Sequence, residues 1–169
     1  MNKDKYEKRY RNISDWFRKS ETRLKLFEIF YKMLPIIVFL VYGIIILLEV
    51  INGSVSETIR VVATPFVTFA LCTIVRKGIN EKRPYEVMNI NPLIIKSKKG
   101  QSFPSRHVVS AAVIAMAALY VNITLGIVML MISIMISIIR PIAGVHYVRD
   151  VLGGLVWGIA GGIIGFYII

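Results

Sequence analysis

The residues best suited to chemistry are two histidines and one aspartate. His107 and His146 are the only imidazoles in the chain, and Asp150 follows His146 by four residues. On a helix that begins beside His146, residues four apart share one face. Asp150 can then accept the Nδ1–H of His146, which fixes the ring tautomer and leaves Nε2 free to attack phosphorus. His107 remains as the general acid for the leaving group.

Basic residues near these histidines indicate that the chemistry acts on phosphate. A guanidinium group is always charged and matches phosphate oxygens with two parallel N–H donors. The segment 104–107 opens an apolar run, where the free N–H groups of a helix start favour an anion and Ser105 adds a hydroxyl. The candidates for holding the phosphate are Arg76 or Lys77, Arg83, Ser105, Arg106 and Arg140.

The composition of the chain predicts a membrane protein. Of its 169 residues, 56% are hydrophobic, and the mean hydropathy of +0.65 is too high for an ordinary soluble domain. The formal net charge of +11 is clustered between long apolar runs, which favours a membrane surface or a phosphorylated substrate over nucleic acid. Cys72 is the single cysteine, so a disulfide framework and a thiolate metal site are excluded, and we interpret it as a packing residue.

Five apolar stretches predict five membrane-spanning helices, and therefore an all-α polytopic bundle. The uncharged run from Val108 to Ile139 would measure about 48 Å as one helix, well beyond a hydrocarbon core of about 30 Å. We therefore expect a hairpin with its turn at Asn122, Thr124 and Gly126. The predicted spans are 33–51, 56–75, 105–121, 124–140 and 151–169.

The charged segment 1–32 precedes the predicted membrane domain, 33–169. Its Tyr6, Tyr10, Ile13 and Phe17 recur at helical spacing, which indicates an amphipathic helix on the membrane surface with its basic residues toward anionic headgroups. A partly disordered, solvated tail is equally compatible with this composition.

The last predicted span carries a smooth face of small residues. Gly154, Gly158 and Gly162 repeat at four-residue spacing, so another helix can approach this face closely. Glycine is common in membrane helices, and the repeat does not by itself imply a dimer.

Alternation of five spans brings four distant segments to one membrane face, namely the end of span two, the starts of spans three and five, and the end of span four. Taken singly, an Arg or Lys at a span end is usually a headgroup or topology anchor, and a lone interfacial His is usually structural. The shared face and the complementary roles favour a site, because buried or interfacial ionisable groups are costly unless paired or used. Lys82, Lys96, Lys98 and Lys99 are interpreted as anchors.

The ordered set Arg83-Pro84, then Pro104-Ser105-Arg106-His107, then Arg140-x5-His146-x3-Asp150 resembles the three-part signature of the type 2 phosphatidic acid phosphatase (PAP2) superfamily. The resemblance covers residues 76–150 and implies the helical core of the membrane lipid phosphatase branch. It implies that His146 is the nucleophile that forms a phosphohistidine, with Asp150 as its partner and His107 as the acid. It also implies that Arg83, Ser105 and Arg140 hold phosphate and that the reaction needs no metal.

Three positions depart from the signature. The lysine expected seven residues before Arg83 is replaced by Arg76, with Lys77 next to it, and the spacing favours Arg76. The usual glycine between serine and histidine is Arg106, which can contact a larger headgroup or point to solvent. The usual serine before Arg140 is Ile139, which removes one hydroxyl. None of these replaces the nucleophile, its partner or the acid, so activity is expected.

The charge distribution predicts the side on which the site lies. Members of the superfamily commonly face the cell exterior or a lumen. Here only Arg60 of the 21 Lys and Arg residues falls on the face opposite the site, and ten lie in residues 1–32. The positive-inside rule therefore places the N-terminus and the site in the cytoplasm of a multi-pass, bacterial cell-membrane protein.

The expected function is hydrolysis of a phosphomonoester or diphosphate on a membrane lipid, with phosphatidylglycerophosphate, phosphatidic acid and undecaprenyl diphosphate as candidates. One alternative is a lipid phosphotransferase that passes the same phosphohistidine phosphate to an alcohol. A second is a non-catalytic membrane protein that binds anionic lipids. No cofactor and no nucleic acid partner are expected, and the expected partners are the substrate lipid and the bilayer.

Overall fold

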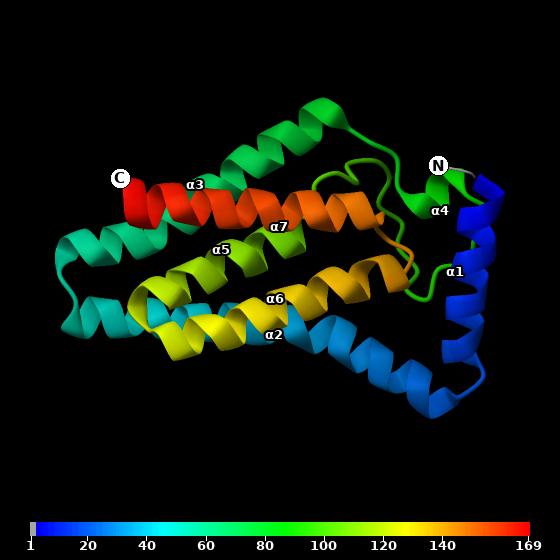
Figure 1. Cartoon of the computed structure of the whole chain (residues 1–169), viewed down its shortest axis with the longest axis horizontal. Coiled ribbons are helices and arrows are strands. Elements are labelled where there is room, and N and C mark those ends of the chain that lie inside the picture. Colours follow the sequence, from blue (N-terminus) through cyan, green and yellow to red (C-terminus); the bar gives the residue numbers. More distant parts are fainter. Residues whose placement is uncertain (1–2) are drawn as a thin grey trace.

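The protein is an all-helical bundle, described by a computed structural model over residues 3–169, and no strand occurs within that range. The first helix crosses one end of the bundle, and the long helices that follow run alternately between its two ends (Figure 1). The predicted fold class is confirmed. The elements are α1 (Lys3–Arg18), α2 (Glu21–Asn52), α3 (Val55–Ile79), α4 (Pro84–Val87), α5 (Arg106–Val121), α6 (Ile123–Ile142), α7 (Val148–Ile163) and the π-helical turn η1 (Ile164–Ile168).

The outer surface of the bundle is apolar, as a membrane protein requires. Four helical stretches within residues 3–169, in α2, α3, α6 and α7 with η1, are long and apolar enough to cross a bilayer. Large apolar side chains on these helices point outward, and Leu40, Phe66 and Val156 are 63%, 71% and 70% exposed. An exposed apolar surface of this extent would be unstable in water. The chain is therefore a multi-pass membrane protein.

The fifth predicted crossing, α5, lies inside the bundle. It has 16 residues, so it measures about 24 Å and is shorter than the hydrocarbon core. Every residue from Val108 to Ala118 is buried, because α2, α3, α6 and α7 pack around this helix. Its many alanines let these neighbours approach closely. The helix that carries His107 is thus held by protein on its sides.

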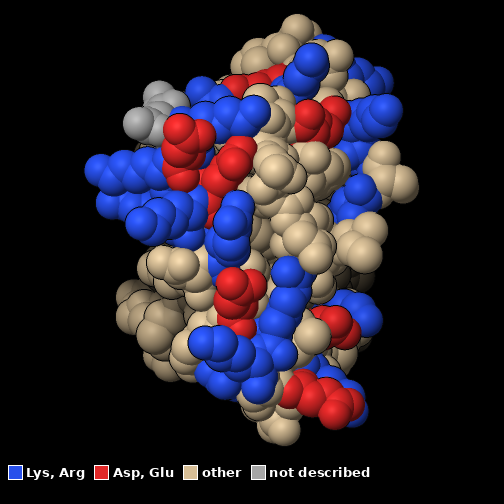
Figure 2. All heavy atoms as spheres, turned by 90° about the vertical axis from the view of Figure 1, so that its right-hand side faces the viewer, with Lys and Arg blue, Asp and Glu red and all other residues tan. Residues whose placement is uncertain are grey.

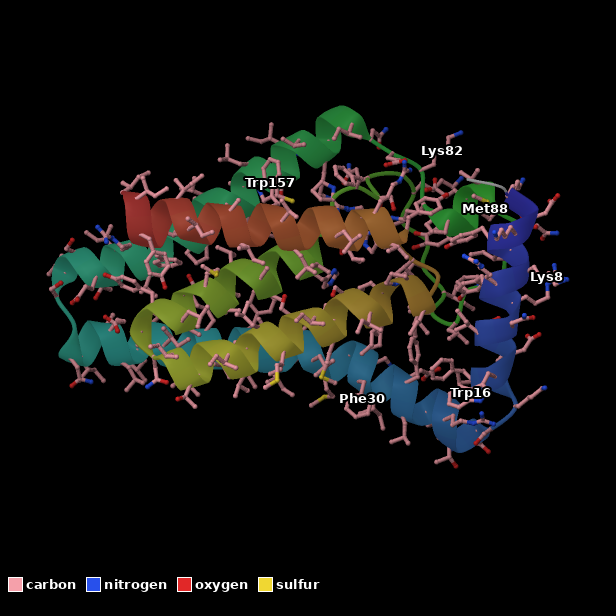
Figure 3. The ribbon with its side chains drawn as sticks, in the orientation of Figure 1. Lys8, Trp16, Phe30, Lys82, Met88 and Trp157 are labelled. Atoms are coloured by element: carbon pink, nitrogen blue, oxygen red, sulfur yellow. The ribbon has the colours of Figure 1, made fainter. Side chains whose placement is uncertain are left out.

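The glycine face of α7 packs against α5 of the same chain. A Cβ at Gly154 would lie 3.0 Å from the Ser105 carbonyl oxygen, and one at Gly158 would lie 2.7 Å from the Val109 carbonyl oxygen. On another side of α7, the Trp157 indole donates a hydrogen bond of 3.1 Å to the Thr68 carbonyl of α3 (Figure 3). These contacts fix α7 against the two helices that carry the other parts of the signature.

The predicted hairpin forms, and its turn is a single residue. Asn122 ends α5 and caps α6, with its side-chain oxygen accepting a 2.9 Å hydrogen bond from the Leu125 N–H. Thr124 and Gly126, predicted to be in the turn, lie inside α6 instead. Gly126 allows the two helices to approach closely, because a Cβ there would clash with Leu119 of α5.

The first membrane helix begins earlier than hydropathy predicts. α2 starts at Glu21 rather than near Met33, with the Ser20 hydroxyl accepting from the Arg23 N–H at 3.4 Å as the N-cap. The proposed domain boundary at residue 32 therefore falls within a continuous helix. These extra turns lie at the end of the bundle crossed by α1 (Figure 1), and they include Tyr31.

The apolar face of α1 packs on the protein as well as lying at the expected membrane surface. The Tyr10 side chain is buried, and its hydroxyl accepts a 3.0 Å hydrogen bond from the Leu93 N–H. The Tyr6 ring lies 5.7 Å from the Tyr147 ring. Lys8 projects outward from the same helix (Figure 3). α1 is therefore amphipathic as predicted, and its apolar side covers the loop between α4 and α5.

Candidate active site

One pocket at the end of the bundle crossed by α1 gathers six of the nine candidate residues predicted from the sequence. Its volume is about 240 Å³. Figure 2 looks onto this end and shows Lys and Arg side chains over much of the face, with Asp and Glu between them. The turn at 104–107 and the segment 140–150 lie at this same end. The lining residues are Tyr31, Arg76, Arg83, Lys96, Lys98, Arg106, His107, Arg140, Val145 and His146.

His146 lies on the short segment before α7 and is 3% exposed. Its Nδ1 is 3.4 Å from Asp150 Oδ2, so the two residues form the pair that their four-residue spacing predicts. The same carboxylate oxygen accepts a 2.9 Å hydrogen bond from the Tyr147 N–H, which caps the start of α7. Asp150 is thus fixed by the helix end, and it faces the Nδ1 side of the imidazole.

The surroundings of His146 keep its ring neutral. Burial lowers its pKa to about 4, and the Arg83 guanidinium acts in the same direction, whereas the Asp150 hydrogen bond opposes the shift. Burial disfavours the charged form of any imidazole because the protein solvates it less well than water does. At neutral pH the ring therefore has a free nitrogen lone pair, as a nucleophile requires.

The two other signature residues at the start of α5 differ in exposure. His107 is exposed toward the pocket and also lines a second, more apolar cavity. Ser105 is buried, and its hydroxyl has no hydrogen-bond partner within residues 3–169. The Ser105 N–H donates a 2.9 Å hydrogen bond to the Asp150 carbonyl, so the second and third parts of the signature are joined directly.

The structure separates the two candidates at the first signature position. Arg76 is 2% exposed, lines the pocket and donates to the carbonyls of Gln101 and Pro104. Lys77 is exposed and is not among the residues that line the pocket. Arg76, which has the spacing of the signature, therefore lies in the pocket, and Lys77 does not. Arg76 also ties α3 to the loop before α5.

Arg83 is held by the same loop. Its Nε donates a 3.0 Å hydrogen bond to the Gly100 carbonyl. Gly100 has a φ of +64°, in the left-handed region that favours glycine, and a Cβ there would clash with the Asn80 side chain. The Glu86 carboxylate accepts from the N–H groups of Arg83 and Gly100 at 2.7 and 2.9 Å. These bonds fold the loop back over α4 and orient the Arg83 side chain.

Tyr31 also lines the pocket, and no pattern in the sequence predicted it. Its hydroxyl accepts a 2.7 Å hydrogen bond from Arg140, whose guanidinium lies 4.3 Å from the centre of the tyrosine ring. An arginine over an aromatic face is attracted by the ring quadrupole. Tyr31 therefore orients Arg140 from α2, outside the three parts of the signature.

Two lysines interpreted as anchors also line the pocket. They are Lys96 and Lys98. The Lys96 ammonium lies 5.7 Å from the centre of the Tyr31 ring. Together with Arg106 they add positive charge to the three arginines of the signature positions. No Asp or Glu lines this pocket in the part of the chain that the structure describes. The interior is therefore suited to a group with more than one negative charge, such as a phosphoryl group.

Comparison with known proteins agrees with this arrangement. The family model of the PAP2 superfamily matches residues 57–169. The structure is similar to LpxE from Aquifex aeolicus, with a TM-score of 0.69 and 22% identity over 83% of this chain and 85% of that one. It is also similar to the first transmembrane PAP2 type phosphatidylglycerolphosphate phosphatase from Bacillus subtilis, with a TM-score of 0.72 and 19% identity over 94% and 83%. At these identities the likeness shows the fold. No curated protein matches the chain.

Proposed function

The chain belongs to the PAP2 superfamily, and on that premise we propose that it is a membrane phosphatase that removes phosphate from a lipid through a phosphohistidine at His146. The observation that carries the proposal is one pocket in which both imidazoles of the chain lie among arginines and lysines, with Asp150 behind His146. The substrate class is a lipid phosphomonoester or diphosphate. Phosphatidylglycerophosphate, phosphatidic acid and undecaprenyl diphosphate remain the candidates.

The proposed reaction has two steps. First, Nε2 of neutral His146 attacks phosphorus, an N–P bond forms, and the P–O bond to the lipid breaks while His107 gives a proton to the departing oxygen. Second, water attacks the phosphohistidine, His107 takes a proton from that water, and the N–P bond breaks to release inorganic phosphate. Asp150 holds the Nδ1–H of His146 throughout and stabilises the positive charge that develops on the ring.

The basic residues have the task of stabilising charge on the phosphoryl oxygens. Arg83 and Arg140 line the pocket with fixed guanidinium groups, and the Ser105 hydroxyl, which has no hydrogen-bond partner among residues 3–169, lies at the start of α5. Donors fixed in advance stabilise the transition state because they need not reorganise during the reaction. Arg76 and Arg106 complete the proposed phosphate-binding set.

An apolar groove that leaves the pocket supports a lipid as the substrate. Arg106 and His107 line both the pocket and a cavity of about 210 Å³ between α2, α3 and α5. That cavity continues past Phe39, Phe69 and Ser110 into another of about 330 Å³. An acyl or prenyl chain can lie in this groove while its phosphate reaches His146.

The first experiment measures phosphate release by the detergent-purified protein from a panel of lipid phosphates. His146→Ala is expected to abolish release while leaving the protein folded, because the nucleophile is lost. A chelator is expected to leave the wild-type rate unchanged, since the proposed chemistry uses imidazole and guanidinium groups only. Release by the purified His146→Ala protein would contradict the proposal.

A second experiment tests the groove. Ser110→Phe places a ring where the two cavities share lining residues, so turnover of a long-chain lipid phosphate is expected to fall. Turnover of a short, soluble phosphomonoester by the same variant serves as the control and is expected to be kept. Equal losses with both substrates would argue against a chain-binding groove.

We also propose that the pocket faces the cytoplasm. The support is the charge asymmetry, since Arg60 alone among the 21 Lys and Arg residues lies near the opposite end. A cysteine introduced at Lys98, with Cys72→Ala as background, is expected to resist an impermeant label in intact cells and to react after permeabilisation. Labelling in intact cells would place the pocket on the outer side.

A further inference from the structure

Ser102 is a buried serine outside the three-part signature that lies between all three parts. It is in the loop before α5 and is 0% exposed. Its N–H donates a 2.8 Å hydrogen bond to the Glu81 carbonyl, and its own carbonyl lies 3.5 Å from an Arg76 guanidinium nitrogen. The backbone of Ser102 is therefore held by α3 and by the residue Glu81 that follows it.

The Ser102 hydroxyl points at the partner of the proposed nucleophile. It donates a 2.5 Å hydrogen bond to Asp150 Oδ2, and its oxygen lies 3.5 Å from His146 Nδ1. Asp150 Oδ2 also accepts from the Tyr147 N–H, whereas Oδ1 has no hydrogen-bond partner within residues 3–169. The hydrogen bonds of the carboxylate are therefore made through Oδ2, while the Arg149 Nε lies 3.9 Å from Oδ1.

We propose that Ser102 is a positioning residue for the phosphohistidine reaction, acting on His146 through Asp150; the inference rests on the proposed function. The Nδ1–H of His146 faces two oxygens at similar distances, Asp150 Oδ2 at 3.4 Å and Ser102 Oγ at 3.5 Å. The hydrogen bond from Ser102 keeps Oδ2 toward the ring and Oδ1 toward Arg149. The pair therefore keeps the proton on Nδ1, and Nε2 remains the nucleophile.

The location of Ser102 predicts which kinetic constant it controls. It is fully buried and does not line the pocket, so it does not contact the substrate. Loss of the Ser102 hydroxyl should leave substrate binding unchanged. It should weaken the interaction of Asp150 with the His146 ring, which becomes important when positive charge develops on that ring. In such a case kcat falls and KM stays nearly constant. Hydrogen bonds to charged groups are the stronger ones, and the expected fall in kcat is roughly ten- to a hundredfold.

The test compares three variants of the full-length protein in detergent. Ser102→Ala removes the hydroxyl and is expected to lower kcat with KM little changed. Ser102→Cys keeps a weak donor in a similar volume and is expected to fall between alanine and wild type. Ser133→Ala is the matched control, because Ser133 is equally buried, lies in α6 and has an unpartnered hydroxyl within the described residues. It is expected to match wild type.

A spectroscopic measurement separates positioning from a general loss of structure. His107→Gln leaves His146 as the single imidazole, so nitrogen NMR of the ring reports its tautomer directly. With Ser102 present the proton is expected on Nδ1, and with Ser102→Ala in the same background both tautomers are expected.

The outcomes distinguish this inference from the proposed function. If wild type turns over lipid phosphate through His146 but Ser102→Ala has the wild-type kcat, the positioning role is wrong and the phosphatase assignment stands. A fall in kcat with an unchanged tautomer, or an equal fall in Ser133→Ala, also overturns it. If Ser102→Ala does not fold, Ser102→Cys decides, since a folded cysteine variant with an unchanged tautomer and kcat contradicts the inference. A wild type without turnover refutes the proposed function instead.

Discussion

Residues 57–169 and residues 3–52 meet at one pocket but contribute different kinds of groups to it. The first region supplies the two histidines, Asp150 and the arginines that point at the proposed phosphate position. The second supplies Tyr31 on α2 and the contacts of α1 with the loop before α5. In α1, Glu7 accepts from the Asn89 N–H at 2.8 Å and Arg18 donates to the Asn91 carbonyl at 3.0 Å.

This difference indicates that one region carries the reacting groups and the other carries groups that support them. Reacting groups must have a fixed type and spacing, so they form a signature. Groups that only orient an arginine or hold a loop can be replaced by other residues that make similar contacts, so they form no recognisable pattern. Variants of the signature residues within 57–169 should therefore change turnover strongly, and variants of the supporting residues within 3–52 should change it weakly while altering local stability.

The largest effect is expected from Asp150→Asn. The amide keeps the size of the carboxylate but cannot stabilise the positive charge on His146, and it can present an N–H to Nδ1. By analogy with other Asp–His pairs, kcat should fall roughly a thousandfold or more. Phosphate release from a lipid phosphate measures this. A loss of less than tenfold would contradict the role of Asp150 as the partner of His146.

The next effect concerns the pH dependence of His146. With a pKa lowered to about 4 by burial and by Arg83, the ring stays neutral at pH 5, where an ordinary histidine would have about thirtyfold less of the neutral form. Because the folded pKa lies below the unfolded value, the contribution to stability is present above pH 6.5 and is lost as pH falls toward 4. Ring NMR of His107→Gln measures the midpoint. A midpoint near 6.5 would show that the site is more open to water than described.

A smaller effect is expected from Tyr31→Phe in the other region. The change removes the acceptor for Arg140 but keeps the ring beneath the guanidinium, so activity should fall roughly two- to tenfold, as for one hydrogen bond. Tyr120→Phe is the control, because Tyr120 stacks on Phe166, away from the pocket. If Tyr31→Phe matched Asp150→Asn in effect, the proposed division between the two regions would fail.

The smallest effect on turnover is expected from Tyr10→Phe. The variant leaves the Leu93 N–H without its acceptor, which costs about 1 kcal/mol locally, while no pocket residue changes. Hydrogen exchange of the segment 88–94 should become faster by roughly fivefold, and kcat should stay within about twofold of wild type. Unchanged exchange would mean that α1 does not stabilise this loop.

Much of the membrane fold could be predicted from the sequence because hydropathy reports lipid-facing helices directly. The uncharged run 108–139 is too long for one membrane crossing, so it predicts the hairpin at Asn122 and two crossings in opposite directions. The start of α2 at Glu21 could not be read in this way, since a helix continues through charged residues once it leaves the hydrocarbon core. The short, fully surrounded α5 was placed correctly, but its burial depends on its neighbours.

Within the site, the residues with a signature were predictable and their supports were not. His107, His146 and Arg140 line one pocket as their spacing suggested. The roles of Ser102 and Tyr31 could not be predicted, because they depend on how the loop 88–105 folds back and on α2 starting as early as Glu21. Lysines in that loop were read as anchors for the same reason, since the sequence does not show which way a loop turns.

The most direct test of the central claim is to trap the covalent intermediate. Wild-type protein mixed with a lipid carrying radiolabelled phosphate, denatured in alkali and mapped by mass spectrometry, is expected to carry phosphate on the peptide that contains His146. His146→Ala is expected to carry none. Phosphate release without any phosphohistidine, or phosphate found on His107 instead, would contradict the account.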